Sequence, residues 1–284
     1  KLSMSYSKVK SYSKINLALN VIGKTASLHK IESIITFINL YDEISIKNIK
    51  NKSHKIKFIG KFSNNISSIN TVSKLLKNID KDKLLKATKL EIIIKKNIPL
   101  EAGLGGGSMN AATILKFLVK KKLINISEEK LYRICSSVGS DVILGMHSNN
   151  LILKSNNTIK EFLIKKNIFT LVVKPSFGCS TKKIYSRVKK FRKAKFNKPL
   201  KSMFDLGFLK KMNNDLELIA LNKYPKLNTL KKFLDKLSKV EFVRMTGSGS
   251  AIIAYFKSHK MCKEAEKKVK NKFRNYWCKT AKTI

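Results

Sequence analysis

The sequence predicts an α+β protein of two domains, and its length, its apolar content and two different hydrophobic periods support this fold class. The chain has 284 residues, and at roughly 100 to 200 residues per domain this length favours two domains. Apolar residues make up 43% of the chain, which is enough for a folded core. Residues 13–21 alternate like a half-buried strand, whereas residues 69–79 place apolar side chains at the three- and four-residue intervals of an amphipathic helix.

The other predicted elements follow the same two periods, with strands ahead of helices in the first half. Strands are expected at 33–40, 43–47, 55–59, 89–94, 142–144, 151–153, 169–173 and 251–256. Helices are expected at 108–120, 216–221, 227–237 and 259–273, and from Ser127, which can cap a helix that ends before Gly139. A polar stretch just before residue 160 is the best boundary, which predicts domains of residues 1–160 and 161–284.

The charge of the chain is strongly positive, with 60 Lys and Arg against 18 Asp and Glu and a formal net charge of +42. Such a charge attracts phosphates, so nucleic acid is the first partner to consider. However, the lysines are spread almost evenly, and only five basic residues are arginine, the side chain best suited to reading base edges. The densest basic stretch is 182–193, which is also compatible with the polar face of a helix. We therefore expect no specific nucleic-acid partner.

Membrane and metal sites are not indicated. No stretch approaches the ~18 uncharged apolar residues of a membrane span, and the first 14 residues lack the apolar segment of a secretory signal, so a cytoplasmic protein is expected. The four cysteines and four histidines are scattered, without the spacing of metal ligands, which predicts reduced thiols and no bound metal of the protein's own. We expect a monomer or a weak homodimer.

Glycine is scarce, yet four of the 12 glycines occupy positions 103, 105, 106 and 107, between a predicted strand and a predicted helix. Glycines allow positive φ and let a phosphate approach backbone amides without a Cβ in the way. The following helix presents unpaired N–H groups to the same anion. The segment is neither a Walker loop, which needs Gly-Lys-Ser/Thr, nor a Rossmann loop, which opens the first βαβ unit. It predicts a phosphate-binding loop, with a simple connecting turn as the alternative.

Four segments together resemble the GHMP kinases, a family of ATP-dependent small-molecule kinases. They are Pro99-Leu100-Glu101-Ala102-Gly103-Leu104-Gly105-Gly106-Gly107-Ser108-Met109-Asn110-Ala111-Ala112, Ser13-Lys14-Ile15-Asn16-Leu17, Gly139-Ser140-Asp141-Val142, and Met245-Thr246-Gly247-Ser248-Gly249-Ser250-Ala251. Their order is that of the family, and weaker matches occur at Asp42-Glu43 and Ser180-Thr181. The resemblance implies the two-domain GHMP kinase fold, with an N-terminal domain like domain 2 of ribosomal protein S5 and a C-terminal ferredoxin-like domain.

The resemblance also implies roles for individual residues. ATP would be bound by the loop residues Pro99, Leu100, Glu101, Ala102, Gly103, Leu104, Gly105, Gly106, Gly107, Ser108 and Met109, with Mg²⁺ accompanying the nucleotide. Asp141 would be the base that takes the proton of the substrate hydroxyl, and Lys14 would pair with it and with the transferred phosphoryl group. Asn16, His29, Thr181, Gly247 and Gly249 would contact the substrate. Without the resemblance, His29 is an ordinary surface histidine, Thr181 a helix cap, and the two glycines a hairpin turn.

Within the family, the triple glycine is most similar to kinases that phosphorylate the 2-hydroxyl of 4-diphosphocytidyl-2-C-methyl-D-erythritol, a cytidyl diphosphate-linked polyol of the non-mevalonate isoprenoid pathway. Ser27-Leu28-His29 departs from that group, which usually has Gly-Tyr-His, so an aromatic ring that stacks on cytosine must come from elsewhere, or the stacking must be weaker. Tyr12 and Phe177 are candidates. The alternatives are a homoserine or mevalonate type of kinase and a catalytically inactive, basic RNA-binding relative.

Overall fold

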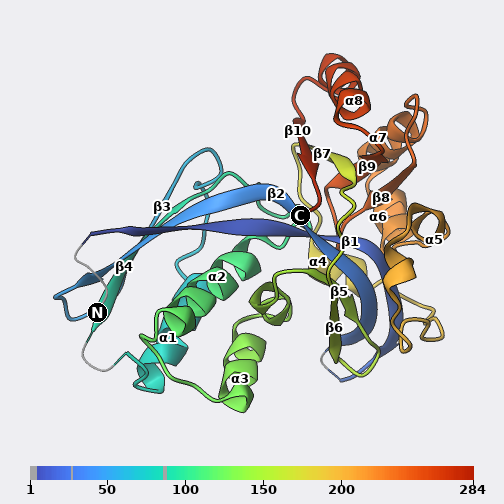
Figure 1. Ribbon diagram of the computed structural model, residues 1–284. Helices are drawn as coiled ribbons and strands as arrows, with labels where there is room; N and C mark the ends of the chain where they lie inside the picture. The colour runs from blue at the N-terminus through green and yellow to red at the C-terminus, as the bar shows by residue number, and fades with distance from the viewer. Residues whose placement is uncertain (1–4, 27, 86–87) are drawn as a thin grey trace. The chain divides into compact units, whose positions relative to one another are not determined.

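The computed structural model describes residues 5–26, 28–85 and 88–284 (Figure 1). The chain forms two compact units. The first unit comprises the chain up to Ser13, Leu40–Pro99 and Gly105–Ser148; the second comprises Lys14–Asn39, Leu100–Leu104 and Asn149–Ile284. Two long strands, β1 (Ser7–Lys24) and β2 (His29–Ile49), belong partly to each unit, as does the predicted phosphate loop.

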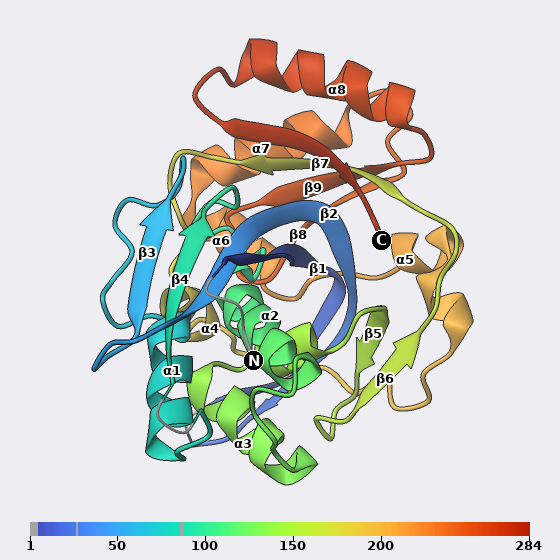
Figure 2. The same cartoon turned by 60° about the vertical axis from the view of Figure 1, so that its left-hand side comes forward.

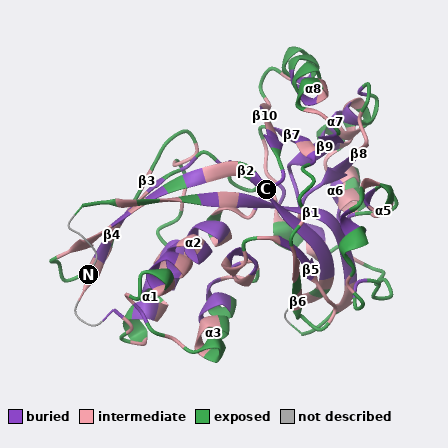
Figure 3. Cartoon of the chain, viewed as in Figure 1, coloured by how far each residue is buried: buried purple, intermediate pink, exposed green. Residues whose placement is uncertain are grey.

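The first unit places helices on one face of a short sheet (Figures 1 and 2). β2 pairs antiparallel with β4 (Lys89–Lys95), and β4 pairs in parallel with β3 (Lys55–Ile59). The helices are α1 (Thr71–Lys81), α2 (Gly106–Lys120), α3 (Glu128–Val138) and the 3₁₀ helix η1 (Ile143–Met146). Apolar side chains of β2 and β4 meet those of α1 and α2 in one core, while α1 and α3 keep an exposed face (Figure 3).

The second unit contains an antiparallel sheet of four strands in the order β10 (Trp277–Lys282), β7 (Phe169–Lys174), β9 (Ile252–Phe256) and β8 (Phe242–Met245). Its longer helices are α6 (Glu217–Lys223), α7 (Pro225–Asp235) and α8 (His259–Lys272), and its short ones are α4 (Thr181–Tyr185), η2 (Lys201–Phe204) and α5 (Leu206–Lys210). The first half of β2 pairs with β5 (Asn150–Leu153), which pairs with β6 (Ile159–Phe162). Its core joins the sheet to α6, α7 and α8.

Most predicted elements are confirmed, and three corrections are informative. The runs 33–40 and 43–47 form the single strand β2, and residues 142–144 are not a strand but the start of η1. The prediction of a half-buried strand at 13–21 is wrong, because every residue of this stretch of β1 is buried. Strands β6, β8 and β10, helix α5 and the 3₁₀ helix η2 were not predicted. The compact units do not divide the chain at residue 160, so that domain boundary stays a prediction.

The N-terminus of α1 provides a stability prediction. Asn70 Oδ1 accepts hydrogen bonds from the N–H groups of Val72 and Ser73, and the Ser73 hydroxyl accepts one from Asn70 N–H. Replacing Asn70 by Ala removes this cap and should lower the free energy of unfolding by about 1 kcal/mol. Asn78→Ala, within the same helix, should change it by less than about 0.5 kcal/mol. Equal effects of both variants in urea denaturation would contradict the assignment of the cap.

Candidate active site

The side chain of Asn16 connects β1, β2 and the glycine-containing loop after β8 in the second unit. Its Oδ1 accepts hydrogen bonds from Lys14 Nζ at 2.8 Å and from Gly247 N–H at 3.1 Å, while its backbone N–H donates to Thr246 Oγ1 at 3.0 Å. Its Nδ2 donates to Ser33 Oγ on β2 at 2.8 Å. Asn16 is only 2% exposed, so these bonds satisfy a polar group that would otherwise be costly to bury. Two predicted substrate-site residues, Asn16 and Gly247, are therefore in direct contact.

Lys14 lies beside this network on β1. Its ammonium group contacts Asn16, and its backbone N–H donates to the carbonyl oxygen of Leu104 at 3.2 Å. The side chain is 4% exposed, although lysine is seldom buried without a partner. The structure thus brings the predicted catalytic lysine next to the segment Leu100–Leu104, which is the first part of the predicted ATP loop.

Glycine is required where the segment Leu100–Leu104 meets the loop after β8. Gly103 has φ +72°, and a Cβ there would lie 2.0 Å from the carbonyl oxygen of Thr246. The Thr246 hydroxyl donates to Gly103 O at 3.2 Å, and Ser250 N–H donates to Glu101 O at 3.1 Å. Gly247 also has positive φ, at +53°. The two predicted glycine segments therefore lie side by side, at a spacing that side chains would prevent.

The second part of the ATP loop forms the N-terminus of α2 in the first unit. Gly105 caps the helix in the left-handed conformation, with φ +68°, and Met109 N–H donates to Gly105 O at 2.8 Å. The amides of Gly106, Gly107 and Ser108 precede the first intrahelical bond, so they are available to an anion. The Met109 side chain is buried, whereas Gly105 and Gly106 are half-buried and Gly107 is exposed.

A buried ion pair lies beneath this helix terminus. Lys96 Nζ pairs with an Asp42 carboxylate oxygen, and both side chains are almost fully buried. Asp42 Oδ1 also accepts hydrogen bonds from the N–H groups of Asn97 and Ile98, at 2.7 and 2.9 Å. A Cβ on Gly106 would lie 3.4 Å from Lys96 Nζ. Asp42 therefore fixes the chain just before the loop, a role that its weak sequence match did not reveal.

Asp141 lies between α3 and η1 in the first unit and is half-buried. Its segment is held against α2, because Gly145 is so close to that helix that a Cβ there would lie 2.5 Å from Ala112 Cβ. At the other end of the segment, a Cβ on Gly139 would lie 3.6 Å from Ser108 Oγ. The first unit thus places the segment of the predicted base beside the first turn of α2.

His29 faces two aromatic rings of the second unit. Its ring centroid lies 5.0 Å from that of Tyr185 and 6.4 Å from that of Phe191. Partial burial and the nearby Lys24 ammonium lower the pKa of His29 below its usual range, so the imidazole is neutral at pH 7. Neither ring was anticipated, because both lie about 150 residues further along the chain.

The two aromatic residues suggested from the sequence have other neighbours. Tyr12 packs edge-on against Tyr41 in the first unit, and Phe177 stacks on Tyr224 in the second. Leu28 is 65% exposed, and Ser27 lies outside the described residues. The ring contacts of His29 therefore come from Tyr185 and Phe191.

Thr181 begins the short helix α4, whose cap is Ser180 rather than Thr181. The Thr181 and Ser248 hydroxyls are 2.9 Å apart, which links α4 to the loop after β8. In that loop, Gly249 has φ +86°, and a Cβ there would lie 2.8 Å from Met245 Sδ. Thr181, Gly247 and Gly249 thus lie at one loop, and their contact with the substrate stays a prediction.

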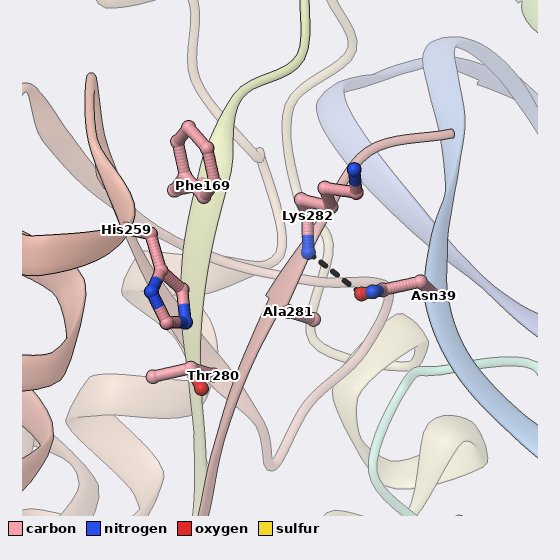
Figure 4. Close-up of a pocket in the computed structure, with 6 residues that line it drawn as sticks. All are labelled: Asn39, Phe169, His259, Thr280, Ala281 and Lys282. Carbon is pink, nitrogen blue, oxygen red and sulfur yellow. Dashed lines mark hydrogen bonds between the residues drawn. The ribbon is translucent and has the colours of Figure 1, made fainter.

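A shallow pocket of about 320 Å³ in the second unit involves none of these residues. It is lined by Asn39, Phe169, His259, Thr280, Ala281 and Lys282 (Figure 4). Lys282 N–H donates to Asn39 Oδ1 at 2.8 Å, while the Phe169 and His259 rings lie on the other side of β10. The lining contains no carboxylate that could act as a base, so this pocket does not carry the predicted chemistry.

Within the described ranges, no helix combines the length and apolar character needed to cross a membrane. Those ranges also hold no group of three or more His, Cys, Asp or Glu side chains placed to bind a metal ion. All four cysteines are buried free thiols.

Comparison with known proteins decides the family. The family model GHMP kinases N terminal domain matches residues 70–150, and the model GHMP kinases C terminal matches residues 188–275. A 4-diphosphocytidyl-2-C-methyl-D-erythritol kinase from Pelagibacter ubique is 54% identical over 281 residues, covering 99% of this chain and 100% of that protein. The chain belongs to the 4-diphosphocytidyl-2-C-methyl-D-erythritol kinase family of GHMP kinases.

More distant members of this kinase family extend over the same length. The protein of that name from Clostridium tetani is 31% identical, covering 98% of this chain and 100% of the relative. A crystal structure of a 4-(cytidine 5'-diphospho)-2C-methyl-D-erythritol kinase has a TM-score of 0.77 at 19% identity, covering 97% of this chain and 99% of that one. The predicted GHMP kinase fold is therefore confirmed. Because the two family models leave residues 151–187 between them, a boundary at residue 160 remains a prediction.

The contact between the glycine segments yields a second prediction. Gly103→Ala places a Cβ against the Thr246 carbonyl and strains a positive φ, so it should reduce turnover at least about tenfold and lower the free energy of unfolding by about 1–3 kcal/mol. Gly207→Ala is the matched control, since its Cβ would meet nothing within 4 Å. Steady-state kinetics and urea denaturation of both variants test this. Wild-type behaviour of Gly103→Ala would show that the two segments need not approach so closely.

Proposed function

We propose that this protein transfers the γ-phosphoryl group of ATP to the 2-hydroxyl of 4-diphosphocytidyl-2-C-methyl-D-erythritol, in the non-mevalonate pathway to isoprenoid precursors. The observation that carries this function is the 54% identity to the Pelagibacter ubique kinase over nearly the whole chain. The neutral His29 and its aromatic neighbours support the choice of a cytidyl substrate over homoserine or mevalonate, which have no base to recognise.

Asp141 is the proposed catalytic base. An alcohol is a weak nucleophile until its proton is accepted, and a carboxylate within hydrogen-bond reach of the hydroxyl can accept it. Lys14 is proposed to pair with that carboxylate and to offset the charge that develops on the transferred phosphoryl oxygens. Asn16 holds the Lys14 ammonium in place, and burial limits the positions that the lysine can take. Lys14 and Asp141 belong to different units, so the roles rest on the family motifs.

The ATP phosphates are proposed to bind at the N-terminus of α2. The amides of Gly106, Gly107 and Ser108 and the positive end of the helix dipole favour an anion there. Mg²⁺ is bound in such kinases through a few protein oxygens and the substrate phosphates, and here it would offset phosphate charge. The residues present fit this mode of Mg²⁺ binding, because the half-buried hydroxyl of Ser108, in the first turn of α2, is a protein oxygen of the required kind.

The cytidine end is proposed to bind at His29. A neutral imidazole can both donate and accept a hydrogen bond, which suits the mixed donor and acceptor edge of cytosine. Tyr185 and Phe191 provide flat apolar faces beside it, so they are proposed to replace the stacking residue that Leu28 cannot supply. Thr181 and the loop at Gly247 and Gly249 are proposed to contact the remainder of the substrate.

The function is tested by ADP release from the purified protein with ATP, Mg²⁺ and each of three alcohols. Turnover is expected with 4-diphosphocytidyl-2-C-methyl-D-erythritol and not with homoserine or mevalonate. Turnover with either control alone would assign the protein to another GHMP kinase activity. A folded protein that turns over none of the three, but binds RNA with a steep dependence on salt, would instead support an inactive RNA-binding relative.

The role of the base gives a separate prediction. Asp141→Asn keeps the shape of the side chain but cannot accept the proton, so kcat should fall by at least about a hundredfold. ATP affinity should change by less than about threefold, because the phosphates are bound by backbone amides. Asp235→Asn is the control, since Asp235 is the exposed last residue of α7 and forms an ion pair with Lys231. Unchanged kcat in Asp141→Asn would remove this residue from the mechanism.

A further inference from the structure

Residues 188–196, here called the basic strap, follow α4 in the second unit without forming a helix or strand. Five of the nine are Lys or Arg, and all residues from Lys189 to Lys195 are exposed. The strap also carries Phe191, which contacts His29. A charged, irregular segment has little tendency of its own to hold one conformation. Its position must therefore be set by contacts with neighbouring elements.

Glu32 on β2 holds the end of the strap. This side chain is completely buried, and its Oε1 accepts hydrogen bonds from Lys195 N–H and from Asn20 Nδ2, both at 2.8 Å. Its Oε2 accepts a hydrogen bond from Phe196 N–H at 2.9 Å. Three N–H donors thus compensate the burial of the carboxylate, and two of them belong to the strap backbone. The Phe196 ring is also completely buried.

Asp215 holds the middle of the strap. Its Oδ1 forms an ion pair with Arg192 Nε at 2.6 Å, and its Oδ2 accepts a hydrogen bond from Val21 N–H at 2.9 Å. Arg192 N–H donates in turn to Val21 O at 2.9 Å. Arg192 is therefore fixed to β1 through both its side chain and its backbone. Phe191 immediately precedes Arg192, and the hydrogen bonds to Glu32 begin at Lys195, four positions after Phe191.

We propose that Glu32 is a positioning residue for substrate binding: it holds the basic strap so that Phe191 stays against His29 and the strap lysines face the anionic cytidyl diphosphate end of the substrate. This inference rests on the proposed function. Glu32 acts through the strap and does not touch the substrate. The carboxylate is the acceptor of choice because it satisfies two successive backbone N–H groups and a side-chain amide at once.

The first test is Glu32→Gln, which keeps the volume of the side chain but replaces one carboxylate oxygen by an N–H₂ group. The KM for the cytidyl substrate should rise at least about tenfold, as expected when a charged buried acceptor is lost, while kcat and the KM for ATP change less than about threefold. Glu161→Gln is the matched control: Glu161 Oε1 also accepts a backbone N–H bond, from Asn149, but on β6. An equal rise in the KM for the cytidyl substrate in both variants would overturn the proposal. A fall in kcat without a rise in this KM would also overturn it.

A double-variant comparison separates positioning from general destabilisation. If Glu32 acts through Phe191, then Glu32→Gln combined with Phe191→Leu should have about the same KM as the worse single variant. A KM equal to the product of the two single effects would show that Glu32 acts independently of Phe191, and would overturn the proposal. Should Glu32→Gln fail to fold, Arg192→Gln tests the second anchor, because Arg192 is exposed and its loss threatens the core less.

Hydrogen exchange of the strap amides provides a readout that does not depend on turnover. The amides of Arg192, Lys195 and Phe196 should be protected in the wild type, and those of Lys195 and Phe196 should exchange faster in Glu32→Gln. Faster exchange without a change in KM, or in the affinity for cytidine diphosphate, would overturn the substrate role of the strap. A wild type that protects the strap but phosphorylates no cytidyl substrate would refute the proposed function instead.

Discussion

The buried carboxamide of Asn16 is the interaction on which the glycine segments of the second unit depend. One planar group accepts hydrogen bonds from Lys14 and Gly247 and donates to Ser33, so it fixes β1, β2 and the loop after β8 to one another. An apolar side chain of equal size would leave three buried polar groups without this partner. The same bonds set the position of the Lys14 ammonium. Packing of these segments and placement of the Lys14 ammonium group are therefore achieved by the same residue.

Acidic residues are scarce in this chain, and several of them are buried where they hold irregular backbone. Asp42 accepts hydrogen bonds from the backbone N–H groups just before the predicted phosphate loop, and Glu32 accepts them from the basic strap. Glu217 accepts one from Met245 N–H, just before the second glycine loop. Burial raises the pKa of Glu217, and the Met245 N–H opposes this effect. In a chain of net charge +42, these carboxylates contribute little to solubility. Asp42 and Glu32 satisfy backbone N–H groups in segments without regular secondary structure, and Glu217 satisfies one at the end of β8.

The sequence predicts helices and strands correctly where the period of the apolar residues decides the local structure. It predicts structure or burial wrongly where contacts with a distant segment decide them. Residues 142–144 have the apolar character of a strand, but Val142 caps the 3₁₀ helix η1, in which Gly145 packs closely against α2. The polar residues Asn16 and Asn20 favoured an exposed face of β1, yet both are buried because Ser33 and Glu32 on β2 satisfy them. A sequence pattern shows that a residue is polar; it does not show whether another segment will provide its hydrogen bonds.

The aromatic surroundings of His29 show the same limit for the candidate site. The motif residues could be placed by resemblance, and the loss of tyrosine at Leu28 was visible, but its replacement was not. Tyr185 and Phe191 lie beside His29 in the folded chain, where Glu32 and Asp215 anchor the basic strap and the Thr181–Ser248 contact links α4 to the loop after β8. A ring that comes from a different segment can serve the same base, since stacking depends on the position of the ring and not on the order of the residues along the chain. Under the proposed function, the leucine at position 28 moves the stacking role to a different segment, and the order of that segment depends on the anchors of the strap.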